Sequence, residues 1–158
     1  MAKADVVRAW VEKLLADLNG GPVAADPDGD YPFRAGSAGF YVRLMGTDEP
    51  IVQVFSVVLR GVRRTAALLS AVNEINTQIA FARVFWVRDQ VLVETELLGL
   101  TLDREELDRA LGSVSRIAQH YGEELQKTYG GRKTFEDPAP EPPPPPAPLH
   151  CDGTGLYL

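Results

Sequence analysis

The chain has 158 residues, of which 45% are hydrophobic and 24% are charged, as in an ordinary soluble globular domain. The formal net charge of -6 at pH 7 argues against duplex nucleic acid or an anionic membrane as a partner, because both bind positively charged surfaces. The basic stretch RGVRR at residues 60–64 is interpreted as a solvated turn. No apolar run is long enough to cross a bilayer, and the N-terminus lacks a signal-peptide pattern. The sequence therefore predicts a cytoplasmic protein, and the excess of arginine over lysine indicates a bacterial one.

The first half of the chain predicts one helix and three strands. Residues 4–18 carry apolar side chains at helical spacing, and NGGP at 19–22 ends this helix. Extended segments follow at residues 30–36, 38–46 and 50–61, with connections short enough for hairpins. We therefore expect an antiparallel meander. The third segment is apolar on both faces, which is typical of a central strand covered on two sides.

The second half predicts a helix, a hairpin and a long helix. Residues 65–79 return to helical spacing, and two strands at 81–87 and 91–97 flank a tight turn. Asp103 and Glu106 form a capping-box pattern at the start of the last helix. The order α-β-β-β-α-β-β-α predicts an α+β fold, in which helices pack on an antiparallel sheet of about five strands.

The composition changes after the last helix. We expect one domain over residues 1–130 and a proline-rich tail over 131–158, because EDPAPEPPPPPAP favours polyproline II and disorder. The tail ends in the apolar segment GLYL at 155–158. We expect this segment to dock on apolar surface of the sheet, since the tether gives it a high effective concentration.

The chain offers no catalytic motif. His120 is expected on a helix surface, and the pair His150 and Cys151 lies in the tail, which cannot hold a nucleophile and its base rigidly. Glu94 and Glu96 share one strand face without a histidine or aspartate cluster, so they are interpreted as a solvated sheet face. We therefore expect no enzyme activity, no catalytic residue, no cofactor and no metal.

The predicted strands carry more apolar surface than three helices can cover. Each aromatic side chain of the fourth strand is interpreted as core: Phe81, Phe85 and Trp86. The remaining surface suits a dimer partner, or an extended peptide bound by edge-strand addition or groove packing. The candidate peptide-binding residues lie on the second strand, which can be closer to an edge than the strand at 51–59: Phe40, Val42 and Leu44.

Three segments carry a resemblance to a known family. LLSAVNEIN, FARVFWVRDQVLVETELL and GLTLDREELDRAL resemble YbjN-like proteins, which have the type III secretion chaperone-like fold; the resemblance covers roughly residues 1–127. It implies a homodimer with a non-enzymatic, chaperone-like or regulatory role that binds a protein segment. We therefore expect a chaperone or adaptor for an extended segment of a partner protein. The alternative is a regulatory scaffold that recruits partners through its proline-rich tail.

Overall fold

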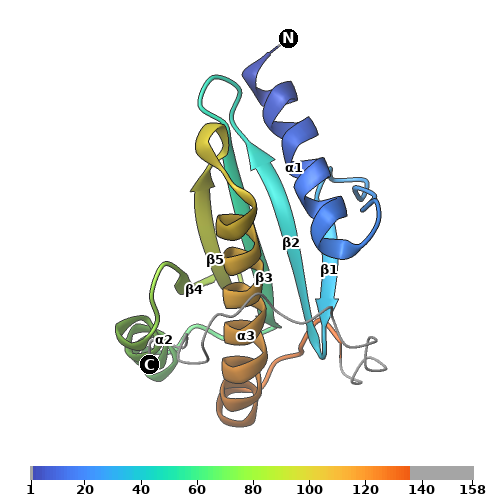
Figure 1. The fold of residues 1–158 in the computed structure, drawn as a ribbon. Coiled ribbons are helices and arrows are strands. Elements are labelled where there is room, and N and C mark those ends of the chain that lie inside the picture. Colours follow the sequence, from blue (N-terminus) through green and yellow to red (C-terminus); the bar gives the residue numbers. More distant parts are fainter. Residues whose placement is uncertain (1, 136–158) are drawn as a thin grey trace.

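The computed structural model describes residues 2–135, and its elements follow the predicted order (Figure 1). A short 3-10 turn, η1, is the one addition, and it joins the last strand to the last helix. The elements are α1 (Lys3–Asn19), β1 (Tyr31–Ala35), β2 (Ala38–Met45), β3 (Ile51–Arg60), α2 (Ala66–Gln78), β4 (Arg83–Val87), β5 (Gln90–Leu98), η1 (Gly99–Thr101) and α3 (Arg104–Tyr129).

The five strands form one antiparallel sheet with the order β1-β2-β3-β5-β4. β3 lies in the middle, as its two apolar faces predicted, and β1 and β4 form the edges. The predicted α+β fold is therefore confirmed. The β4–β5 hairpin turns through Arg88 and Asp89, which both have positive φ angles, as a two-residue turn matched to the strand twist requires.

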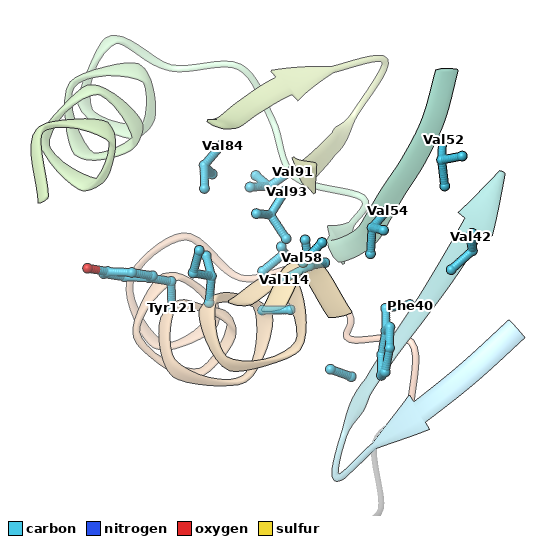
Figure 2. Packing of buried hydrophobic residues seen from close by; sticks show 14 of the residues in the cluster. Phe40, Val42, Val52, Val54, Val58, Val84, Val91, Val93, Val114 and Tyr121 are labelled. Atoms are coloured by element: carbon cyan, nitrogen blue, oxygen red, sulfur yellow. The ribbon is translucent and has the colours of Figure 1, made fainter. Parts of the chain in front are cut away.

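The helices cover one face of the sheet, and the core lies between the two layers (Figure 2). Alternate strand residues point toward the helices because successive side chains of a strand leave on opposite faces. In Figure 1, α1 and α3 lie in front of the sheet. Core residues from both layers include Val42, Val52, Val54, Val91 and Val93 from the strands, and Leu14, Leu68, Leu107, Val114 and Tyr121 from the helices.

Short polar and glycine signals fix where the helices begin and end. The Asp103 carboxylate accepts a hydrogen bond from the Glu106 amide at 2.8 Å, and the Glu106 carboxylate accepts one from the Asp103 amide at 3.3 Å. This capping box confirms the predicted start of α3. Gly20, with φ of 74°, ends α1 in the left-handed conformation that glycine adopts at low cost.

One side chain joins α2 to the edge strand β4. The Asn76 amide group donates to the Val84 carbonyl and accepts from the Val84 amide, both at 2.8 Å. The sequence places Asn76 on the polar side of its helix, but that position does not reveal this pairing. The side chain supplies the backbone of β4 with hydrogen bonds on the side where no further strand pairs with it.

No described helix covers the sheet face that points away from the helix layer, and its side chains shield one another only in part. We call it the open face. Cross-strand pairing aligns its side chains in rows, of which the central one is Tyr41, Phe55, Glu94 and Arg83, and the next is Val57, Leu92 and Phe85. The Tyr41 and Phe55 rings stack at 5.3 Å, and the Arg43 guanidinium lies 4.7 Å from the Phe55 ring centre. Phe55 is therefore only 8% exposed although no helix covers it.

The chain leaves α3 and continues to contact the domain up to the last described residue. Arg132 and Arg60 exchange backbone hydrogen bonds of 2.8 and 2.9 Å. The Thr134 hydroxyl donates to the Val57 carbonyl, and the Phe135 amide donates to the Ser37 carbonyl. We expected the domain to end at residue 130, but residues 131–135 belong to it structurally. The rest of the expected tail, with His150, Cys151 and GLYL, lies outside the described residues.

We predict that Asn76→Ala lowers the free energy of unfolding by about 1–3 kcal/mol, because both polar backbone groups of Val84 lose their partner. Urea unfolding measures this change. Asn73→Ala is the matched control, since Asn73 is exposed on the same helix, and we expect an effect within about 0.5 kcal/mol. Equal effects of the two substitutions would show that the Asn76 pairing does not stabilise the β4 edge.

Candidate functional site

The three candidate peptide-binding residues of β2 face the helices. Phe40 is 8% exposed, Val42 is fully buried, and Leu44 packs against the core. The predicted alternation is present, but the helix layer covers the face that carries Phe40, Val42 and Leu44. On this strand the side chains that face away from the helices are those of Tyr41, Arg43 and Met45. A partner would reach the three predicted residues only if the helix layer opened, so the surface accessible to a partner lies elsewhere.

An accessible apolar surface lies where α1, η1 and the end of β5 meet. A shallow hollow of about 370 Å³ opens there. Three large apolar side chains that line it are 39–56% exposed: Val6, Trp10 and Leu100. Leu98 precedes Gly99, which also lines the hollow, and is 71% exposed. We call these four residues the α1–η1 patch. A cluster of exposed apolar side chains on one surface is typical of a protein-binding site.

The Trp10 ring is held in place within this patch. Its indole N–H donates to the Leu102 carbonyl at 2.8 Å, and the Lys13 ammonium lies 5.5 Å from the ring centre. The side chain remains 39% exposed. A fixed aromatic ring loses little conformational entropy when a partner binds it, so Trp10 is suited to be an anchor.

The close packing of Gly99 explains why the neighbouring leucines are exposed. Its amide donates to the Pro50 carbonyl at 2.8 Å, and an added Cβ would lie 2.7 Å from that oxygen and 2.8 Å from Val7 Cγ1. Only glycine fits this close approach. The tight contact occupies the inward position, and Leu98 and Leu100 on either side are 71% and 56% exposed. Since Leu98 pairs with Ile51, the patch continues onto the open face.

A second exposed apolar region lies along β4. Phe81 was interpreted as core, but its side chain is 90% exposed. The residue stands in the joint between α2 and β4 with a φ of 59°, and its carbonyl accepts a hydrogen bond from the Thr95 hydroxyl at 2.6 Å. Val87, at the other end of β4, is 37% exposed, and β5 is the only strand that pairs with β4 in residues 2–135.

Glu94 differs from the expected solvated carboxylate. It is 5% exposed, accepts hydrogen bonds from Arg83 and accepts one from the Gln53 amide at 2.8 Å. The hydrogen bond with Glu94 raises the pKa of Arg83. The Glu96 side chain is 42% exposed, which agrees with a solvated position. Arg83 joins the two carboxylates in one ion-pair group, because its guanidinium also lies 3.6 Å from the Glu96 carboxylate.

Residues 2–135 contain no cluster of three His, Cys, Asp or Glu side chains that could hold a metal ion. His120 is a half-exposed helix residue whose Nε2 lies 3.9 Å from Glu124. None of the described helices is long and apolar enough to span a membrane.

Two solved structures show the same fold at low sequence identity. One is the HopA1–SchA chaperone–effector complex, with a TM-score of 0.58 and 9% identity over 73% of this chain and 92% of the matched chain. The other is the ExsC–ExsE complex, with a TM-score of 0.58 and 15% identity over 82% of this chain and 97% of the matched chain. No curated protein sequence matches the chain.

The family comparison covers nearly all of the described residues. Residues 5–137 match the family model TY-Chap1, described as "T3SS (YopN, CesT) and YbjN peptide-binding chaperone 1". The match includes both apolar regions and the segment after α3, and it confirms the resemblance found in the sequence. The chain thus belongs to the TY-Chap1 family of peptide-binding chaperones related to type III secretion and YbjN proteins.

Proposed function

We propose that this protein is a non-enzymatic chaperone that binds an extended segment of a partner protein at the α1–η1 patch. The observation that carries the proposal is the hollow lined by exposed Val6, Trp10 and Leu100 and continued by exposed Leu98, with Trp10 held by the Leu102 carbonyl. Membership of a peptide-binding chaperone family supports it. The two similar complexes support the same class of partner, since one is a chaperone–effector complex.

The patch suits a segment with apolar anchors and an extended backbone. Burying a Leu or Trp side chain contributes roughly 1.5–3 kcal/mol, so a few anchors give a modest affinity after the cost of ordering the segment. Leu98 extends the apolar surface from the hollow toward Ile51 on the open face. A bound segment therefore passes from the helix side around the end of the sheet. This arrangement favours an unfolded client stretch over a folded partner.

We also propose a homodimer formed along β4 and α2. No second strand of residues 2–135 lies beside β4, and Asn76 occupies only the Val84 backbone groups of this edge, so apolar side chains next to it can pack against a second copy. Phe81 and Val87 lie at the two ends of this edge and are exposed. An isologous contact would bury each Phe81 side chain near the Val87 end of the other copy, because a two-fold axis brings opposite ends of the two strands together. We place the protein in the bacterial cytoplasm, without nucleic acid or membrane as a partner.

We predict that Leu100→Glu weakens peptide binding about 10-fold or more, because a charge replaces an exposed apolar anchor. The probes are peptides selected on the wild-type protein from a random 16-residue phage library and measured by fluorescence anisotropy. Ala66→Glu is the matched control, since it adds the same charge at an exposed position of α2. Unchanged binding by Leu100→Glu would contradict the proposed site, and peptides that bind only through residues 136–158 would favour the scaffold alternative.

We predict that Phe81→Asp converts the dimer to a monomer, because each interface end would then bury a carboxylate in place of an apolar ring. Asp tolerates the positive φ angle at this position, so the joint keeps its conformation. Light scattering should give twice the 17.3 kDa of one chain for the wild type and the single mass for the variant. Leu100→Glu should stay dimeric. A monomeric wild-type protein at micromolar concentration would rule out the dimer.

A further inference from the structure

We propose that the chain covers its own peptide site. Residues 136–148 cross the open face of the sheet, and residues 149–158 dock in cis on the α1–η1 patch as an internal competitor of the client. The inference rests on the proposed function, because it assigns a regulator to that same site. It is carried by the path of residues 132–135 and by the length of the segment that follows.

The chain is anchored on the open face at its last described residue. The Phe135 amide donates to the Ser37 carbonyl, and the Thr134 hydroxyl donates to the Val57 carbonyl. The Arg34 guanidinium lies 3.9 Å from the centre of the Phe135 ring. Arg34 pairs with Gly39 across β1 and β2, so both residues face away from the helices. The chain has therefore passed from the helix side around the end of the sheet.

Gly39 makes room for this crossing. A Cβ at this position would lie 2.9 Å from Thr134 Cγ2 and 3.2 Å from the Phe135 ring, closer than side chains tolerate. Glycine leaves a slot in the face of β2, and the Thr134 and Phe135 side chains fill it. The next residues of β2 on the same face are Tyr41 and Arg43, so a chain that continues along the strand meets an aromatic surface. Proline-rich segments commonly bind aromatic surfaces of this kind.

The following segment is long enough to reach the patch. In β3, Val57 lies beside Thr134 and Ile51 pairs with Leu98, and six residues of strand span roughly 20 Å. The proline-rich residues 138–148 span roughly 34 Å in polyproline II. A segment of this reach carries residues 149–158 past the end of β3 to Leu98 and Leu100. The apolar residues Leu156, Tyr157 and Leu158 then lie where the client anchors would bind.

Cis docking sets a threshold for the client. A short tether gives an effective concentration on the order of millimolar, so even a weakly bound segment occupies the patch most of the time. A client has to displace residues 149–158 from the patch. The apparent affinity of the client is therefore reduced in proportion to the fraction of chains whose patch is free. The patch is also shielded from unrelated apolar surfaces while no client is present. Residues 149–158 would thus make the chaperone selective for clients that bind more tightly than its own chain.

The full chain contains one cysteine, Cys151, and a nitroxide label there reports where this segment lies. We expect strong paramagnetic broadening of the backbone NMR signals of residues 6–10 and 98–102. The double variant Leu156→Glu/Leu158→Glu should lose it, because charged side chains do not dock on the patch. Mixing labelled unenriched chains with unlabelled ¹⁵N chains separates contacts within one chain from contacts between chains. Absence of broadening at the patch in the wild type, or broadening only between chains, would overturn the proposal.

Peptide binding then separates this inference from the proposed function. The library-selected peptides should bind Leu156→Glu/Leu158→Glu about 10-fold more tightly than the wild type, since the competitor is gone. Equal affinities would overturn the cis competitor while leaving the peptide site intact. If Leu100→Glu abolishes peptide binding in both the wild type and the double variant, the peptide site at the patch is supported. If binding is unchanged in both, the proposed peptide site is wrong.

Discussion

The rest of the structure depends on one constraint. The central strand of the sheet is apolar on both faces, but the three helices cover only one face of the sheet. The covered face has an ordinary core with Val52, Val54 and Val93. The other face has to be protected from water by other means. It uses the stack of Tyr41 on Phe55 and the arginines beside it. The position of both candidate binding regions follows, because each lies where this second face reaches an edge or an end of the sheet.

Most of the fold is readable from the sequence because its signals are local. Helical spacing, strand alternation and the capping box of Asp103 and Glu106 each involve residues a few positions apart. The central position of β3 also follows from its own composition. Alternation shows that the two faces of β2 differ, but it does not show which face the helices cover. That choice depends on how distant elements pack, and for this reason Phe40 and Val42 were expected to meet a peptide and are core instead.

The site itself is less predictable because it arises from pairings between distant segments. Glu94 is buried only because strand register places it beside Gln53 and Arg83. The α1–η1 patch joins residues that are about 90 positions apart. A sequence signal was nevertheless present in LLGLTLD, since a short connection with so many leucines has more apolar side chains than it can bury. The contact of Gly99 with Pro50 decides which of them stay outside.

Phe81 has a consequence for any effort to stabilise this protein. A non-glycine residue with φ of 59° costs roughly 1–2 kcal/mol, and a side chain that is 90% exposed recovers almost nothing by burial in one chain. A thermal-stability screen on the separated domain would therefore reward Gly at this position. The same screen would remove the aromatic ring that the proposed dimer buries. Selection for thermal stability and selection for the proposed dimer would therefore favour different residues at this position.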